Sequence, residues 1–431
     1  MKFYNWNKSI VSNPSRVFYP KNKEEIAELI NSAITSNKKI KAVGKHRHVF
    51  SEISSVADNN WFLCMSEMDN IINIDDKNMT VTVESGCTLK TLNSELLKKG
   101  FCLNIMGGID KQCIGGLIAT ATHGSSLKFG TFSDSVVAIE LITCEGFIKK
   151  FDQKHEYFHA FATHLGALGI ITSVTLHITP AYNLKQTIED LPTLPTSDEM
   201  ISILKNNDYC EILYFANTSQ MVIRKRNRSE YRSRLAWFDS FKDDVSNSFQ
   251  QMLIKIMKRH PSFISTAFGF AKRTIIGERE GPAPEIFIAN DLHGAYNITD
   301  VLDQEYAFPI EKMDEVNTKL HEIFKKYSDV PIVGSIRFAP ASENWIAPNY
   351  GINTVYFDVS ILTVTPPPSL IAYIDKEMDE IGARPHWGKR NNVTRSYAEW
   401  VYPKFHDFEA VCSKFDPYEM FVNPYLSRLF G

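Results

Sequence analysis

The sequence predicts an α+β fold divided into two domains. The chain has 431 residues, which is more than one hydrophobic core usually organises. Strand and helix patterns alternate in short units over residues 1–180, whereas 181–330 are richer in aromatic residues, basic stretches and irregular connections. This change in composition places the boundary between the two domains near residue 180.

The elements of the first domain follow from the spacing of apolar residues. Residues 24–37 (EEIAELINSAITSN) repeat apolar side chains at helical spacing and begin with two glutamates, which the helix dipole favours there. Residues 79–84 (MTVTVE) alternate as a half-buried strand does. Residues 89–100 form an amphipathic helix with late lysines and Gly100 as its C-cap. Further strands are expected at 39–44, 135–146 and 167–180, and further helices at 311–327 and 369–382.

Two stretches interrupt these patterns in the second domain. Residues 191–199 (LPTLPTSDE) have the prolines and small polar residues of a loop or linker. Residues 224–234 (RKRNRSEYRSR) are strongly basic. A solvated surface is the favoured interpretation of this basic stretch, and a patch that binds phosphate or another anion is the alternative.

Composition argues against several classes of protein. A formal net charge of −3 gives no basic field, so we expect no nucleic-acid partner. The seven cysteines are odd in number and form no CxxC pair, which favours reduced, mostly buried thiols. The N-terminus, MKFYNWNKSIVSNP, lacks the apolar core of a secretory signal, and no apolar run is long enough to span a membrane. We therefore expect a cytoplasmic protein.

One segment is rich in small residues: 107–124 reads GGIDKQCIGGLIATATHG. Glycine, alanine and threonine at this density do not build a core, but they let the backbone approach a ligand and turn N–H groups toward phosphate oxygens. The alternative, a glycine-rich turn between two buried strands, stays open for this segment alone. Neither GxGxxG after a first strand nor GxxxxGK[ST] is present, so neither a Rossmann fingerprint nor a P-loop explains it.

A second glycine turn lies upstream, in AVGKHRHVFSEI (42–53). A strand ends at Gly44, and His46 and His48 follow within four residues. A lone histidine is more often structural, but a pair directly after a strand-end glycine favours contact with a ligand or cofactor. No further cluster of metal ligands accompanies the pair, so we expect no metal site.

Several short stretches, spread over the chain, are specific to one family only when they are taken together. They are VGKHRHVFSEI, VTVESGCTLKTLN, NIMGGIDKQCIGGLIATATHGS, HLGALGIITSVTL, QEYAFP, SIRFAPASENWIAPNYG, RPHWGK and FDPYEMFVNPYLSRLFG. Together they resemble the FAD-binding oxidases of the vanillyl-alcohol-oxidase type, and within them the alditol oxidases and the sugar-1,4-lactone (gulonolactone and arabinonolactone) oxidases. The resemblance runs through nearly the whole chain.

The resemblance implies a PCMH-type FAD-binding domain, made of two small α/β subdomains, over residues 1–180. A substrate or cap domain on a mixed sheet would occupy 181–384, and the segment 385–431 would return to the FAD domain. Ligand pockets usually lie at domain interfaces, so the site is expected between these units.

The resemblance also implies which residues hold FAD. The segment 107–124 would cradle the diphosphate and pass beside the flavin ring, where the missing side chains of Gly107 and Gly108 leave room for oxygen. The backbone near Ile170 would contact the adenine. The full set of implied cofactor contacts is Gly44, His46, His48, Gly107, Gly108, Cys113, Gly116, Ala119, Thr120, Thr122, His123, Gly124, Ile170 and Lys389.

His48 matches the family position that carries a covalent bond to the flavin, since Phe50–Ile53 then fall into register. The chain departs from the family pattern in two ways. It has one extra residue between Gly44 and His48, and Val49 stands where serine is usual. His46 is therefore the rival position, and non-covalent FAD also stays open.

The residues implied for catalysis lie in the second half. A flavin enzyme that oxidises an alcohol must orient the substrate carbon, accept the hydroxyl proton and stabilise the reduced flavin. Arg337 resembles the family arginine that holds the substrate hydroxyl, and Lys389, beside His386, resembles the lysine near the flavin. Ser335 stands where alditol and lactone oxidases have glutamate, so general-base help from this position is lost. Glu305 is either a local carboxylate or, as favoured, a scaffold hydrogen-bond acceptor.

The predicted function is an FAD-dependent oxidase of a CH–OH group, which passes a hydride to flavin N5 and is reoxidised by O2 to give H2O2. The expected substrate is a polyol, a sugar lactone or a similar small alcohol. A flavin dehydrogenase of a specialised metabolite with another acceptor is the alternative. A flavin-binding protein without turnover is a third hypothesis, which the presence of Arg337, His386 and Lys389 disfavours.

Overall fold

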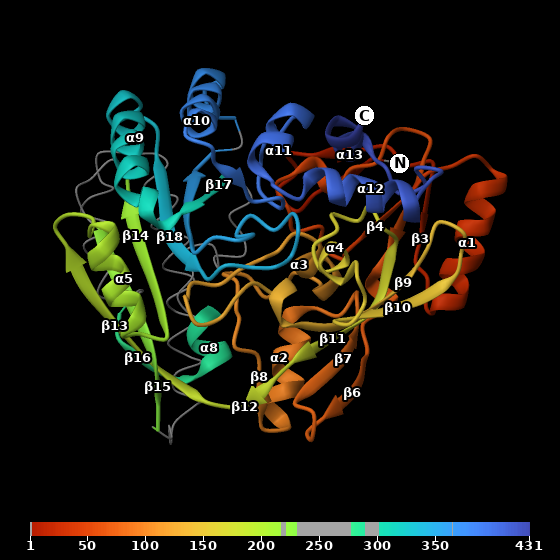
Figure 1. Ribbon diagram of the computed structural model, residues 1–431, viewed down its shortest axis with the longest axis horizontal. Helices are drawn as coiled ribbons and strands as arrows, with labels where there is room; N and C mark the ends of the chain where they lie inside the picture. The colour runs from red at the N-terminus through yellow and green to blue at the C-terminus, as the bar shows by residue number, and fades with distance from the viewer. Residues whose placement is uncertain (1, 217–220, 231–276, 289–300, 364) are drawn as a thin grey trace.

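A group of smaller sheets and one large sheet lie side by side and divide the molecule into halves (Figure 1). The computed structural model describes residues 2–216, 221–230, 277–288, 301–363 and 365–431. The α+β class is as predicted, since helices and mostly antiparallel sheets occur in both halves. Within the part of the chain that the structure describes, no helix combines the length and the apolar character needed to cross a membrane.

The first half is built on two sheets. Five strands form an antiparallel sheet in the order β10-β9-β11-β7-β6, and three form a parallel sheet in the order β3-β5-β4. The alternation predicted at 79–84 is that of β7, in which Val81 and Val83 are fully buried. These strands are β3 (Arg16–Phe18), β4 (Ile40–Val43), β5 (Trp61–Cys64), β6 (Ile71–Asp75), β7 (Thr80–Glu84), β9 (Val136–Ile142), β10 (Ile148–Asp152) and β11 (Ile170–His177); two small pairs join β1 (Phe3–Tyr4) to β2 (Val11–Ser12) and β8 (Phe101–Cys102) to β12 (Thr179–Pro180).

Short helices cover these sheets. The first, α1 (Lys23–Thr35), begins where the side chain of Asn22 accepts a hydrogen bond of 2.9 Å from the Glu25 amide. The second, α2 (Leu89–Lys98), ends before Gly100, whose φ of 83° is the left-handed conformation predicted for a C-cap glycine. The remaining helices of this half are α3 (Ile114–Ala119) and α4 (Phe158–Phe161).

The second half holds one eight-stranded sheet in the order β16-β13-β15-β14-β18-β19-β17-β20. In the centre of this sheet, β18 and β19 pair so that Ser335 lies opposite Asp358 and Arg337 lies opposite Tyr356. The strands are β13 (Asn183–Leu191), β14 (Tyr209–Phe215), β15 (Met221–Ser229), β16 (Arg279–Pro282), β17 (Leu302–Pro309), β18 (Ile332–Ala339), β19 (Thr354–Ile361) and β20 (Arg384–Pro385); the helices are α5 (Ser197–Lys205), α8 (Ala283–Ile288), α9 (Met313–Lys326) and α10 (Pro368–Glu380).

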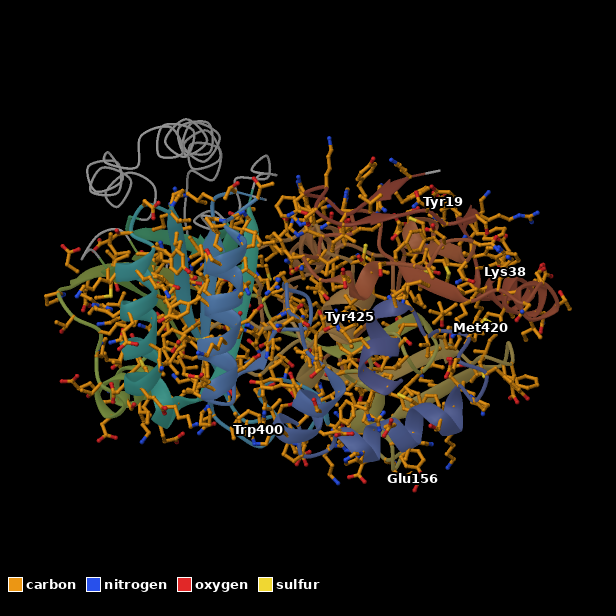
Figure 2. The ribbon with its side chains drawn as sticks, turned by 90° about the horizontal axis from the view of Figure 1, so that it is seen from above. Tyr19, Lys38, Glu156, Trp400, Met420 and Tyr425 are labelled. Atoms are coloured by element: carbon orange, nitrogen blue, oxygen red, sulfur yellow. The ribbon has the colours of Figure 1, made fainter. Side chains whose placement is uncertain are left out.

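The C-terminal segment packs against the first half (Figure 2). Met420 shares a buried cluster with Ile26 and Ile30 of α1, and its carbonyl accepts a hydrogen bond of 2.9 Å from the Ile40 amide. Asn423 donates to the carbonyl of Ile53 at 3.0 Å. The division at residues 180 and 384 stays a prediction, although the chain enters the eight-stranded sheet at β13, just after 180, and leaves it at β20, just after 384. The helices of this segment are α11 (Arg395–Val401), α12 (Phe405–Phe415) and α13 (Pro424–Phe430).

Two predictions about local structure need correction. The strand expected from residue 167 begins only at Ile170, because Gly169 has a φ of 144° that interrupts extended structure. The basic stretch is not a solvated surface throughout, because Arg224 and Arg226 are 2% and 4% exposed. Arg224 pairs at 2.6 Å with Glu211 on the neighbouring strand. Residues 231–234 of this stretch lie outside the described residues.

Candidate functional site

One cleft collects polar residues from both halves of the molecule. Its empty space, including the open solvent at its mouth, measures about 1470 Å³. The first half contributes β4, the loop after it, and the segments 107–123 and 164–171. The second half and the C-terminal segment contribute Glu305 from β17, Arg337 from β18, and His386, Gly388 and Lys389.

Most residues predicted for the site line this cleft. The structure thus brings together two groups that are more than 200 residues apart in the sequence. Gly124, Ile170 and Ser335 are not among the lining residues, although Gly169 and Ile171 are. The predicted residues that line it are Gly44, His46, His48, Gly107, Gly108, Cys113, Gly116, Ala119, Thr120, Thr122, His123, Arg337, His386 and Lys389.

The cleft walls have open backbone and unpaired polar atoms, as a ligand site requires. A Cβ built on Gly116 would meet no atom within 4 Å, so the backbone there is open to a ligand. The buried polar atoms of the lining that have no hydrogen-bond partner among the described residues include Ser85 Oγ and His164 Nε2. Buried polar atoms are nearly always satisfied, so atoms of this kind in a cleft indicate a ligand that supplies the missing partner.

His48 is held more firmly than its rival His46. Its imidazole stacks on the indole of Trp6, with ring centroids 4.3 Å apart and planes 9° apart. Burial, and then the charge of Lys389, lower the pKa of His48 to about 3. His48 is therefore neutral at neutral pH, as an imidazole that attacks an electrophilic carbon must be. His46 lines the same cleft, but no ring stacks on it in the described part of the chain.

Arg337 and Glu305 form a buried ion pair in the cleft. The Nη2 of Arg337 lies 2.6 Å from Oε1 of Glu305, and Glu305 is only 1% exposed. Burial alone would raise the pKa of Glu305, but Arg337 and His123 hold it well below its usual range. Glu305 is therefore a fixed anion, and it lies in the cleft wall rather than in the scaffold behind it.

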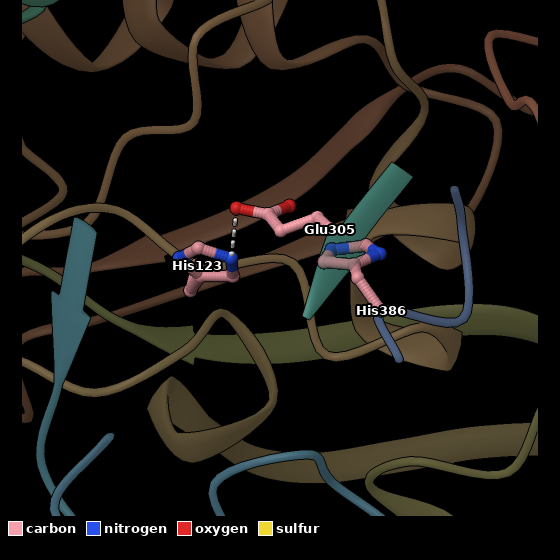
Figure 3. Close-up of side chains that lie close together, drawn as sticks. All are labelled: His123, Glu305 and His386. Carbon is pink, nitrogen blue, oxygen red and sulfur yellow. Dashed lines mark ion pairs between the residues drawn. The ribbon is translucent and has the colours of Figure 1, made fainter. Parts of the chain in front are cut away.

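His123 and His386 lie beside Glu305 (Figure 3). The Nδ1 of His123 donates to the Gly124 carbonyl at 2.9 Å. The Nε2 of the same ring lies 3.3 Å from Oε1 of Glu305. This second contact is a hydrogen bond only when Nε2 also carries a proton. The Nδ1 of His386 accepts from the Gly388 amide at 2.9 Å, so its Nε2 carries the proton. Burial lowers the pKa of His386 to about 3, which makes it a neutral donor.

The ligand atoms of His123, Glu305 and His386 lie within 4.8 Å of one another, a spacing that a metal ion could bridge. Arg337 pairs with Glu305 at the same place, and Lys389 lowers the pKa of His386 by its charge. Two fixed cations oppose the entry of a third positive charge. The absence of a metal site stays a prediction.

Lys389 is held by two carboxylates behind the cleft wall. Its ammonium pairs with Asp303 and lies 3.6 Å from Asp358, and both carboxylates are fully buried. Burial alone would lower the pKa of Lys389, but Asp303 and Asp358 raise it above its ordinary value. Ser335 belongs to this cluster and not to the cleft wall, because its Oγ lies 3.5 Å from Oδ2 of Asp358. Lys389 is therefore a permanent cation.

Two family models match the chain. The FAD binding domain matches residues 14–152, and D-arabinono-1,4-lactone oxidase matches residues 174–429. The second match covers more than half of the chain. The chain belongs to the D-arabinono-1,4-lactone oxidase family. It is an FAD-dependent oxidoreductase, and the predicted family, cofactor and enzyme class are confirmed.

Relatives of this lactone oxidase family member cover its full length. L-gulonolactone oxidase of Bos taurus is 28% identical over 100% of this chain and 98% of its own. L-gulono-1,4-lactone dehydrogenase of Mycobacterium tuberculosis is 26% identical over 99% of this chain and 98% of its own. A cholesterol oxidase from Brevibacterium sterolicum has the same fold, with a TM-score of 0.76 at 14% identity over 100% of this chain and 97% of its own.

Several polar residues near the cleft were not predicted from the sequence. Asp303 and Asp358 interrupt apolar strands, and an acidic residue in such a run is a signal for a buried, paired charge. Lys41 interrupts the short strand β4 in the same way. His164 opens the stretch HLGALGI, of which only the backbone near Ile170 was predicted to contact the cofactor.

Proposed function

We propose that this protein oxidises the CH–OH group of a sugar-1,4-lactone, or of a polyol of similar size, with FAD as cofactor and O2 as electron acceptor. The observation that carries the proposal is the meeting of Arg337 and Glu305 in the cleft that the glycine-rich segment 107–124 also lines. The cofactor-binding and the charged residues thus face one space.

Bound FAD would supply the hydride acceptor. The guanidinium of Arg337, fixed by Glu305, is placed to hold the substrate hydroxyl oxygen as negative charge develops on it. Glu305 is the one carboxylate among the described residues that line the cleft. It is ionised, so it can accept the hydrogen bond of the substrate hydroxyl and orient that group.

The remaining polar groups match an uncharged, oxygen-rich substrate. The Nε2–H of His386 is a neutral donor, and Lys389 is a fixed cation at the same wall. A sugar lactone presents hydroxyl, ring and carbonyl oxygens to such donors and carries no charge that would need a partner. Alditol and lactone oxidases have a glutamate at the position of Ser335, and here Glu305 supplies the carboxylate that faces the cleft. Ser335 contacts Asp358 instead.

The acceptor distinguishes the two candidate functions. Gly107 and Gly108 line the cleft without side chains, which supports access of O2 to the flavin. A dehydrogenase with another electron acceptor is the second candidate function, because the Mycobacterium tuberculosis relative is named a dehydrogenase.

The test is to supply sugar-1,4-lactones in air and to measure H2O2 against lactone consumed. We expect one H2O2 per lactone, with little further gain in rate from an artificial electron acceptor. Turnover that requires the artificial acceptor and releases no H2O2 would instead establish the dehydrogenase.

We further propose that His48 carries the flavin covalently. Its stacking on Trp6 and its lower exposure support this choice over His46, which is exposed. After acid precipitation of the yellow protein, the colour should stay in the pellet. In His48→Ala it should pass to the supernatant, whereas His46→Ala should behave as the wild type. Colour that leaves the wild-type pellet entirely would contradict a covalent bond.

A further inference from the structure

A second group of polar cleft residues lies apart from the Arg337–Glu305 pair. Lys41 of β4 and His164 both line the cleft, and they are 5% and 2% exposed. The Lys41 ammonium donates to the carbonyl of Leu165 at 3.1 Å. It also lies 2.9 Å from the place where a Cβ on Gly166 would stand, and Gly166 has a φ of 75° that favours glycine. The 164–166 turn therefore packs directly against this ammonium.

The charge of Lys41 lacks an acidic neighbour among the described residues. Burial lowers the pKa of Lys41 to about 7, and no carboxylate is among the groups that act on it. A buried ammonium without a counter-charge is costly for a folded protein. A hydrogen bond to one carbonyl satisfies one of its three N–H donors and supplies no full negative charge.

His164 offers a second donor beside Lys41. Its Nδ1 accepts a hydrogen bond of 3.1 Å from the Gly166 amide, so the proton of the neutral ring is on Nε2. Burial, and then the charge of Lys41, lower the pKa of His164 to about 3. The Nε2 is buried and has no partner in the part of the chain that the structure describes. Beyond the Lys41–Leu165 hydrogen bond, Lys41 and His164 thus present further N–H donors that have no acceptor among the described residues.

We propose that Lys41 and His164 bind the adenosine diphosphate half of FAD, with the Lys41 ammonium countering the diphosphate charge and His164 donating to it through Nε2–H. The substrate proposed above is uncharged, so it cannot supply the missing counter-charge. The diphosphate is the charged part of FAD and can supply it. This inference rests on FAD as the cofactor and not on the proposed substrate or acceptor.

The test uses full-length apoprotein from a host deprived of riboflavin and measures binding of ADP and of adenosine by calorimetry. Wild-type apoprotein should bind ADP at least about tenfold more tightly than adenosine, as a charge-assisted contact requires. Lys41→Met should weaken ADP binding at least about tenfold and leave adenosine binding within about twofold. The matched control is Lys39→Met, because Lys39 precedes the same strand but is exposed and pairs with Glu419.

A stability measurement separates this role from a structural one. If the Lys41 ammonium has no counter-charge until a ligand binds, Lys41→Met should raise the melting temperature of the apoprotein. The same variant should weaken ADP binding. If Lys41 only fixes the Leu165 carbonyl, the same variant should lower the melting temperature and weaken ADP and adenosine equally. That second pattern, or ADP binding unchanged by the substitution, overturns the proposal. Lys41→Gln keeps a donor for Leu165 without the charge, and it gives the same test if the methionine variant does not fold.

The role of His164 has its own pair of variants. His164→Leu should weaken ADP binding by about threefold or more, because one hydrogen bond is lost. His164→Gln places an N–H near the position of Nε2 and should recover part of the affinity. Equal loss in both variants would remove His164 from the proposal.

Discussion

At the scale of single residues, charge pairing decides what the site can do. Lys389 cannot act as a base, because Asp303 and Asp358 keep it protonated, and Glu305 is ionised by its contact with Arg337. Arg337 and Lys389 were predictable because short motifs carry them. Asp358 was not predictable, because its contact with Ser335 depends on the register between β18 and β19. That register cannot be inferred from the sequence alone.

We predict that Lys389→Ala slows reduction of the flavin by substrate at least about tenfold, which is ~1.4 kcal/mol of barrier. The variant should also be less stable, because two buried carboxylates lose their cation. Anaerobic stopped-flow absorbance measures the first effect and urea unfolding the second. Lys376→Ala, at an exposed ion pair, is the matched control and should change neither.

Adding Asp358→Asn to Lys389→Ala should restore part of the lost stability, because one uncompensated charge is removed. It should not restore the rate of flavin reduction. An unchanged rate in Lys389→Ala would remove this lysine from the mechanism.

At the scale of elements, short glycine-rich segments shape the cofactor cleft. The helices predicted from apolar spacing begin and end within about two residues of the observed positions, since caps and periodicity are local. The strand before the adenine contact was placed too early because the φ of Gly169 is a tertiary requirement. The helix α3 inside the segment 107–124 was not predicted, because six residues with two glycines carry no helical signal.

We predict that Gly116→Leu keeps or raises the stability of the apoprotein and yet weakens FAD binding at least about tenfold. Leucine is a better helix former than glycine by about 0.5–1 kcal/mol, and the new side chain meets no protein atom but enters the cleft. Fluorescence titration with FAD and thermal unfolding measure the two effects.

Gly115→Ala is the contrasting control for Gly116→Leu. A Cβ on Gly115 would lie 2.9 Å from the Cβ of Ser85, so this change should lower the stability of the apoprotein itself. Wild-type FAD affinity in Gly116→Leu would show that the cofactor lies elsewhere.

At the scale of the whole molecule, folding buries neutral histidines between the two halves. His164 and His386 have pKa values lowered by burial from 6.5 to about 3. The unfolded chain therefore binds more protons than the folded one between these values, and stability falls as the pH drops. The two halves were predictable from composition, but not which faces meet, since that depends on packing of residues far apart in the chain.

We predict that the free energy of unfolding falls between pH 6.5 and pH 4, by up to about 1.4 kcal/mol per pH unit for each of these histidines. Urea unfolding at a series of pH values measures this slope. The double variant His164→Gln, His386→Gln should show a shallower slope, because glutamine does not titrate. An equal slope in the double variant would mean that other groups cause the loss of stability in acid.

The central claim is that this cleft binds FAD and oxidises a sugar lactone through Arg337. Anaerobic mixing of the purified yellow protein with L-gulono-1,4-lactone and D-arabinono-1,4-lactone, followed by absorbance, tests it most directly. We predict that at least one lactone bleaches the flavin in the wild type and that Arg337→Met slows the bleaching at least about a hundredfold, ~2.7 kcal/mol of barrier. A flavin that a chemical reductant bleaches but that no lactone or polyol bleaches would contradict the account.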